Sequence, residues 1–304
     1  MNDGYAYRCV IRPPDAGRSV LAYLAERYRH STQAVWDARV ERGEVRRDDV
    51  PVGAGDLLRA GDVLVWSRPP WDEPEVPLHF DVVHHDADLL VVSKPAGLPT
   101  LPNGGFLTQT LLHAVRRTYA GAVPMHRLGR GTSGLVLFAL SPEARRAVAA
   151  AWRSGQVTRI YRALVTGTPA WDAIRIDTPI GPVPHPRLGR VHAACVGGKD
   201  AASNVRVLAR RGETAVVEVQ IETGRAHQIR IHLAAAGHPL AGDPLYVAGG
   251  VPSSAPGLPG DGGYLLHAHR LALRHPATER FVEFEAPLPA DLAVYGQHHE
   301  PSVI

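Results

Sequence analysis

A proline-rich stretch divides this chain and limits what it can fold into. Pro69, Pro70, Pro74 and Pro77 lie close together after residue 67. Proline fixes its own backbone angle and has no N–H to donate, so such a stretch favours extended chain and a domain boundary. The sequence therefore predicts a small unit over residues 1–67, a linker over 68–77 and a larger domain over 78–300.

The small unit has the pattern of two short helices followed by a hairpin. Apolar residues follow helical spacing from residue 21 to 25, and a second helix is expected from an N-cap at Ser31 to Gly43. This segment resembles the small αL-type RNA-binding module of a ribosomal small-subunit protein. The residues that carry the resemblance are Arg18, Ser31, Gly43, Val45, Gly61, Asp62 and Val63. A purely structural cap is the alternative interpretation.

The larger domain mixes strand and helix patterns without a regular βαβ alternation. Apolar runs predict strands over 89–92, 135–140, 161–165, 215–219 and 281–284. Helices are expected over 111–119, from an N-cap at Ser141 to Gly155, and from 226 to an end at Gly237. The Gly/Pro/Ser-rich stretch over 249–263 is expected to be a loop. We predict an α+β fold with a mixed, mostly antiparallel sheet.

Composition excludes several classes of protein. No run approaches the roughly 18 apolar residues of a membrane helix, and the N-terminus lacks the apolar core of a secretory signal, so a cytoplasmic protein is expected. Cys9 and Cys195 fit no zinc spacing, and the histidines form no metal motif, so we expect no metal.

The basic residues favour a nucleic-acid partner. The pI is about 9.0 although the net charge is only +3. Lys94 and Lys199 are the only lysines, and all the other basic residues are arginines. Arginine presents a planar fork of donors that suits phosphates and base edges. Bias from a GC-rich genome is the alternative explanation.

Five segments, in order, resemble the RluA-type RNA pseudouridine synthases. They are 91–97 (VVSKPAG); 126–134 (HRLGRGTSG); Tyr161 with Ala163 and Val165; 223–230 (TGRAHQIR) with 237–239 and 242–243; and 266–268 (LHA) with 275–276. The resemblance implies the pseudouridine synthase fold, a reaction without cofactor or metal, and a structured RNA partner, either rRNA or tRNA. We expect a monomer.

The resemblance also assigns roles to residues. Tyr161 is expected to stack on the target base, and Arg230 to pair with the catalytic carboxylate. RNA contacts are expected from His126, Arg127, Arg130, Thr132, Ser133, Arg225, His227 and Gln228.

Gly129 stands where the family places its catalytic aspartate. Isomerising uridine to pseudouridine breaks the bond between ribose and base nitrogen, and a carboxylate must act on the sugar beside a flipped base. Glycine cannot do this. The acids Asp86, Asp88, Glu222 and Asp243 occupy positions that are also acidic in active family members, so none is a new replacement. Gly131 and Ala226 are milder departures from the pattern.

The sequence therefore supports two hypotheses. The first is an RNA uridine isomerase that uses an unusual acid, and the second is an RNA-binding protein that does not modify its partner. On mechanism, Gly129 favours the second, and we expect no detectable turnover unless Gly129→Asp restores the acid. Without its partner, the Arg230 charge must be relieved by water, by another carboxylate or by an anion, and an anion site is expected.

Overall fold

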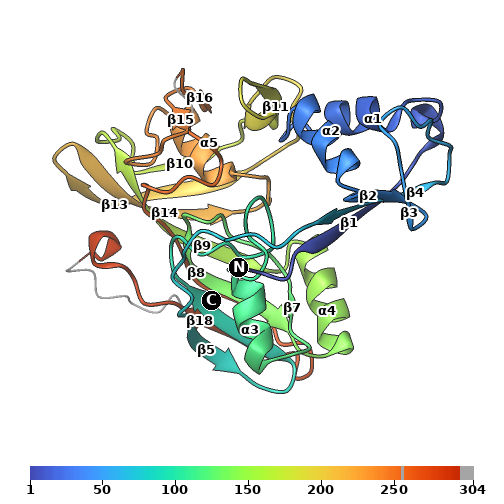
Figure 1. Cartoon of the computed structure of the whole chain (residues 1–304). Coiled ribbons are helices and arrows are strands. Elements are labelled where there is room, and N and C mark those ends of the chain that lie inside the picture. Colours follow the sequence, from blue (N-terminus) through green and yellow to red (C-terminus); the bar gives the residue numbers. More distant parts are fainter. Residues whose placement is uncertain (255–256, 295–304) are drawn as a thin grey trace. The chain divides into compact units, whose positions relative to one another are not determined.

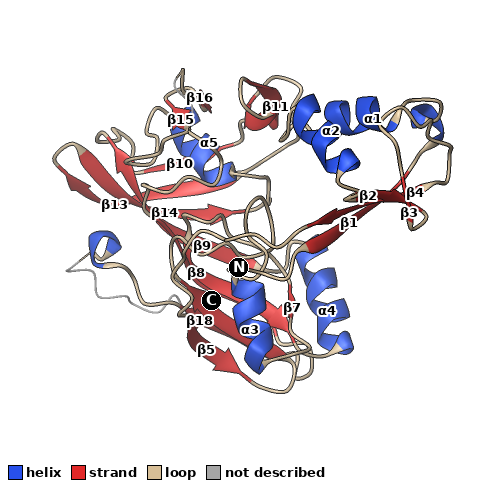
Figure 2. Cartoon of the chain, viewed as in Figure 1, coloured by secondary structure: helices blue, strands red, loops and turns tan. Residues whose placement is uncertain are grey.

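The structure is a computed structural model that describes residues 1–254 and 257–294. The chain forms two compact units (Figures 1 and 2). One unit comprises Met1–Glu73 and His185–Gly189, and the other comprises Pro74–Pro184 and the chain from Arg190 onward.

The first unit is a four-stranded sheet with two helices. The strands β1 (Tyr5–Val10), β4 (Val63–Arg68), β2 (Val45–Arg47) and β3 (Val50–Pro51) pair antiparallel in that spatial order. A 3-10 turn, η1 (Pro13–Asp15), precedes the helices α1 (Val20–Arg27) and α2 (Gln33–Glu41). The helices bury Tyr23, Leu24 and Trp36 against Leu64. Thr32, not Ser31, caps α2 by accepting a hydrogen bond from Val35, so the predicted cap was wrong by one residue.

A ten-stranded sheet is the centre of the second unit, with eight strands in the order β10-β13-β14-β9-β17-β8-β6-β5, plus β18 on β17 and β7 on β8. The pairing of β8 with β17 is parallel, and the others are antiparallel. The strands are β5 (Asp81–His85), β6 (Leu89–Lys94), β7 (Val123–Pro124), β8 (Ser133–Ala139), β9 (Thr158–Thr166), β10 (Ala173–Ile176), β13 (Ser203–Arg211), β14 (Thr214–Ile221), β17 (Leu266–Arg274) and β18 (Phe281–Glu285).

Further helices and short strands lie outside this sheet. They are α3 (Leu111–Thr118), α4 (Pro142–Arg153), α5 (Gln228–Ala235), the hairpins β11 (Ile180–His185) with β12 (Gly189–Ala194) and β15 (Tyr246–Val247) with β16 (Val251–Pro252), and η2 (Ala290–Leu292). None of the described helices is long and apolar enough to cross a bilayer.

The central sheet is apolar on both of its faces. In β6, Leu90 and Val92 join one buried cluster, while Leu89 and Val91 join another. Successive strand residues point to opposite faces, so a strand that is apolar at every position needs cover on both sides. The first cluster includes apolar residues of α3, and the second includes those of α4. The predicted α+β fold with a mixed, mostly antiparallel sheet is confirmed.

Candidate functional site

The loop between β7 and β8 carries Gly129 and is held by hydrogen bonds from the segment after β6. Thr100 Oγ1 donates to Leu128 O and accepts from Leu128 N, at 2.9 and 3.2 Å. Arg130 O accepts from Gly97 N at 2.7 Å and from the buried Lys94 ammonium at 3.4 Å. Lys94 Nζ also donates to Pro95 O and Leu98 O. Burial lowers the pKa of Lys94 to about 7, whereas the three carbonyl oxygens favour its charged form.

The end of this loop enters β8 under close constraint. Gly134 has a φ of +104°, and a Cβ there would lie 2.6 Å from Ala268 N and still closer to Ala268 O. Only glycine therefore fits where β8 meets β17. Ser133 Oγ lies 2.9 Å from His267 Nδ1 across the same strand pair. Burial lowers the pKa of His267 to about 4.

Gly129 is exposed, and its backbone would accept a side chain. It is not among the residues with positive φ, and a Cβ would lie 3.5 Å from both Thr132 Oγ1 and Tyr264 Oη. These are ordinary contact distances. At Gly131, by contrast, a Cβ would lie 2.9 Å from Tyr264 Cζ. Gly131 thus makes room for the Tyr264 ring.

Arg230 is paired with a carboxylate, which corrects the expectation of an anion site. Its Nε and Nη2 donate to the two oxygens of Asp243, both at 2.7 Å, and Nη1 donates to Pro259 O at 3.0 Å. The side chains of Arg230 and Asp243 are 3% and 1% exposed. Two parallel bonds are the strongest arrangement for this pair. Asp243 therefore neutralises the charge, and no phosphate is needed.

Two tyrosine rings flank the same guanidinium. Arg230 Cζ lies 4.4 Å from the ring centre of Tyr264 and 5.0 Å from that of Tyr246. A cation over an aromatic face is attracted by the negative charge of that face. Burial opposes the charged form, yet the Asp243 hydrogen bonds, Tyr264 and Tyr246 raise the pKa of Arg230.

Tyr161 lies on β9 beside a buried arginine that sequence reasoning missed. Tyr161 belongs to the same apolar cluster as Leu128 and Tyr264, and burial raises its pKa while Arg159 lowers it. Arg159 is 9% exposed, donates to Glu222 O at 3.3 Å and forms no ion pair with described residues. Its position two residues before Tyr161 on one strand was the signal that could have found it, because such residues share a face.

The predicted RNA-contacting residues of the loop differ in how they are engaged. Arg127 is exposed. Arg130 donates to Gly260 O at 2.7 Å and lies 3.7 Å from Asp261. Thr132 is buried. His126 accepts from Leu137 N through Nε2, and burial together with Arg159 lowers its pKa to about 3, so its ring is neutral.

At the start of α5, the predicted RNA-contacting residues Arg225 and His227 form hydrogen bonds within the protein. Arg225 Nε donates to Asp200 O at 2.8 Å. His227 takes the left-handed conformation, with φ at 57°. Its Nδ1 donates to Tyr246 Oη, because the single Tyr246 hydroxyl proton goes to His192 O. Burial lowers the pKa of His227 to about 4.

Gln228 has a different place from the one expected. It is buried, and its amide oxygen accepts from Thr223 Oγ1 and Arg225 N. Its amide nitrogen donates to Ala202 O and Ser203 Oγ. No donor or acceptor is left for RNA, so Gln228 positions the turn before α5.

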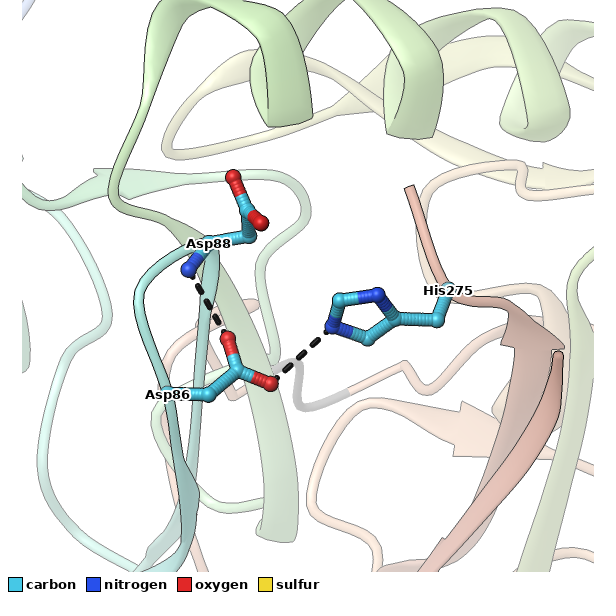
Figure 3. Close-up of side chains that lie close together, drawn as sticks. All are labelled: Asp86, Asp88 and His275. Atoms are coloured by element: carbon cyan, nitrogen blue, oxygen red, sulfur yellow. Dashed lines mark hydrogen bonds and ion pairs between the residues drawn. The ribbon is translucent and has the colours of Figure 1, made fainter. Parts of the chain in front are cut away.

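Among the described residues, Asp86, Asp88 and His275 are the one group with ligand atoms close enough to hold a metal (Figure 3). Asp86 accepts from the amides of Asp88 and Leu89, and its other oxygen lies 2.7 Å from His84 Nε2 and 3.0 Å from His275 Nε2. Burial acts against it, but these hydrogen bonds hold the pKa of Asp86 below its usual range. Protein donors thus satisfy the carboxylate, which ties β5 and β6 to the end of β17.

The acids considered as substitutes are engaged elsewhere. Asp88 accepts from Ser141 Oγ at 2.7 Å, and Glu222 is paired with Arg175. Two groups face position 129 at the same distance, Thr132 and Tyr264, and sequence reasoning did not single out Tyr264. Its only signal was a tyrosine just before the Leu266-His267-Ala268 segment.

Comparison with known proteins agrees with this arrangement. Residues 88–235 match the model of a family described as RNA pseudouridylate synthase. An uncharacterized RNA pseudouridine synthase from Synechocystis is 42% identical, with 90% of this chain and 95% of that protein covered. RNA pseudouridine synthase 5 from Oryza sativa is 36% identical over 95% of this chain and 88% of its own.

Two further relatives extend the comparison. Ribosomal large subunit pseudouridine synthase D from Neisseria meningitidis is 36% identical over 90% of this chain and 76% of its own. Among solved structures, human RNA pseudouridylate synthase domain containing 1 matches with a TM-score of 0.58 and 25% identity, over 73% of this chain and 89% of that one.

Proposed function

Because the chain belongs to the RNA pseudouridine synthase family, of the RluA type, we propose that it isomerises uridine to pseudouridine in structured RNA. The observation that carries the proposal is 42% identity to a pseudouridine synthase over nearly the full length of both chains. The relative from Neisseria is named for the large ribosomal subunit, and we propose rRNA before tRNA as the substrate.

The proposed roles follow the geometry. Tyr161 contacts the flipped base from β9, and the buried Arg159 beside it offers positive charge as the base leaves the sugar. Arg127 and Arg130 contact phosphates, Arg130 after it leaves Gly260 O. His227 offers Nε2 as an acceptor. The protein acts as a monomer, and the first unit binds the flanking RNA.

The test is direct. Total RNA from a strain that lacks the gene is incubated with the protein, and pseudouridine is mapped by chemical sequencing. New pseudouridine at one or a few sites is the expected result. The variant Tyr161→Phe reports whether the ring alone suffices, and Gly129→Asp reports what a carboxylate adds.

A protein that binds RNA without modifying it is the second candidate, and the missing side chain at position 129 is the observation that favours it. Absence of pseudouridine with the parent protein at every RNA site, together with salt-sensitive RNA binding, would select this second function. It would reject the first.

A further inference from the structure

The hydroxyl group of Tyr264 faces the position of the missing aspartate. A Cβ at residue 129 would lie 3.5 Å from Tyr264 Oη, so the hydroxyl lies within the reach of a side chain at that position. The tyrosine is 5% exposed. Its hydroxyl makes no hydrogen bond with described residues, and the oxygen is not among the fully buried atoms that lack a partner. It therefore reaches solvent beside Gly129.

Gly131 makes room for this ring in the loop. Any side chain at Gly131 would meet Tyr264 Cζ at 2.9 Å, within a distance that Cβ atoms do not adopt. A carboxylate on residue 129 would occupy the space that the hydroxyl faces. Gly129 and Gly131 both differ from the family motif, and both lie next to Tyr264.

The surroundings of Tyr264 suit an oxygen that develops negative charge. Arg230 lies over its ring at 4.4 Å, and the Asp243 pair and Pro259 O keep the guanidinium in place. A positive charge held in place near a reacting oxygen stabilises the negative charge that develops there in the transition state. Tyrosine is an established covalent nucleophile, and it attacks the anomeric carbon of sugars in sialidases.

We propose, on the basis of the proposed function, that Tyr264 replaces the aspartate as the group that attacks the ribose. The phenol oxygen bonds to C1′ as the bond from C1′ to N1 breaks, and that electron pair leaves with the uracil, which takes the phenol proton. The ring then turns and C5 bonds to C1′. The phenol oxygen leaves with its bonding pair and recovers a proton from C5. No other reactant is required.

The competing groups are less well placed. Asp243 uses both oxygens on Arg230, and one of them also accepts from Leu245 and Tyr246 amides. Asp261 accepts from Leu258 N and lies near Arg130. Thr132 Oγ1 is as close to position 129 as Tyr264 Oη is, but no hydrogen bond of the described residues joins it to a cation.

The experiment compares four proteins on an RNA that the parent modifies: the parent, Tyr264→Phe, Gly129→Asp and the double variant. Because the Tyr264 hydroxyl makes no hydrogen bond in the described structure, Tyr264→Phe should keep the parent's melting temperature and RNA affinity. Its single-turnover rate should fall by at least about a thousandfold. The double variant should recover turnover through its new carboxylate.

Tyr119→Phe is the comparison, because it removes a tyrosine hydroxyl that packs against the same apolar cluster but does not face Gly129. It should lose less than about tenfold in rate. An independent measurement stops the parent reaction with denaturant and maps any RNA-linked peptide by mass spectrometry. The ribose is expected on Tyr264.

Each other outcome overturns the proposal. Tyr264→Phe within tenfold of an active parent, or an RNA adduct on an aspartate or glutamate, rejects Tyr264 and leaves the proposed function intact. A parent that modifies no RNA, while Gly129→Asp does, rejects both.

Discussion

At the scale of single residues, the buried pair of Arg230 and Asp243 should matter most for stability. Removing one partner of a buried pair leaves an uncompensated charge, so Asp243→Asn should cost about 3–5 kcal/mol of unfolding free energy. Asp261→Asn is the control, because its contact with Arg130 is 3.7 Å long and half exposed, and should cost less than about 1 kcal/mol. Urea unfolding measures both. Equal losses would contradict the importance of burial.

The glycines of the loop should respond in opposite ways to an added methyl group. Gly129→Ala meets no close atom and no unfavourable φ, and it should be neutral or stabilise by up to about 1 kcal/mol. Gly134→Ala collides with the Ala268 backbone and should destabilise by about 1–3 kcal/mol. Thermal melts of the two variants test this, and a Gly134→Ala protein as stable as the parent would contradict the close approach of β8 to β17 at this residue.

Sequence reasoning found residues of the site but not their distant partners. Gly129, Tyr161 and Arg230 were identified from short motifs. Tyr264 lies beside position 129, and Arg230 of α5 pairs with Asp243 from the segment that follows that helix. No local sequence pattern encodes such neighbours. The expectation that Arg230 binds an anion was wrong for this reason: a suitable carboxylate was known, but its position relative to Arg230 was not.

At the scale of elements, helix starts were predictable where a capping residue adjoins a clear apolar pattern. Ser141 caps α4 as predicted, with Pro142 in the first turn. At α2, Ser31 and Thr32 are adjacent and chemically alike, and Thr32 is the cap, while Ser31 accepts from Arg39. Capping preferences do not distinguish two neighbouring hydroxyl residues.

Ser141 should contribute more to the unfolding free energy than an ordinary N-cap residue does. Its oxygen accepts from Ala144 N at 3.0 Å, and its hydroxyl donates to Asp88 at 2.7 Å. Ser141→Ala should therefore lower the unfolding free energy by about 1–2 kcal/mol. Ser154→Ala, at the exposed end of the same helix, should change it by less than about 0.5 kcal/mol. Chemical denaturation measures the unfolding free energy of both variants. Similar losses would argue against a special stabilising role of the Ser141 cap.

At the scale of the whole molecule, fold class was predictable and strand order was not. Alternating and continuous apolar runs identify strands, and their irregular mixture with helices identifies an α+β fold. The central neighbours β9, β17 and β8 come from distant parts of the chain. Periodicity describes one strand at a time, so it does not specify which strand lies beside which.

Stability should fall as the solution is acidified below neutral. The pKa values of His126, His227 and His267 lie at about 3, 4 and 4 in the folded protein, below the usual 6.5. Between pH 6.5 and these values the unfolded chain binds more protons, so acid favours unfolding. The contribution of these three histidines to the unfolding free energy is therefore fully present above pH 6.5 and is lost progressively below it. Asp86, whose folded pKa is also lowered, adds a further loss below about pH 4.

His267 offers the clearest test of that pH dependence. Between pH 6.5 and 5, its protonation alone should remove roughly 2 kcal/mol. Urea midpoints should thus fall less steeply with acid in His267→Asn than in the parent. His79→Asn, at a side chain that is 87% exposed, is the control and should follow the parent. If urea midpoints fall equally with acid in His267→Asn and in the parent, His267 does not contribute to the pH dependence of stability.

RNA affinity should depend steeply on salt, because bound phosphates release counterions. Arg127 is exposed in the loop beside Gly129, and Arg127→Ala should reduce the slope of log affinity against log salt by about 1. Arg210→Ala, whose guanidinium is bound to Pro169, Trp171 and Asp172, should leave the slope unchanged. Filter binding at several salt concentrations measures this slope for the parent and for both variants. A flat response of the parent would reject the RNA partner.

The place of β17 also bears on how the protein is made. This strand, Leu266–Arg274, lies between β9 and β8, and the bond from Ser133 to His267 spans 134 residues. A chain emerging from the ribosome has made β8 and β9 long before β17, at about 5–20 residues per second. Until then the sheet consists of two unjoined halves with open edges. Late closure over such a separation slows folding and leaves apolar strand edges for chaperones to shield.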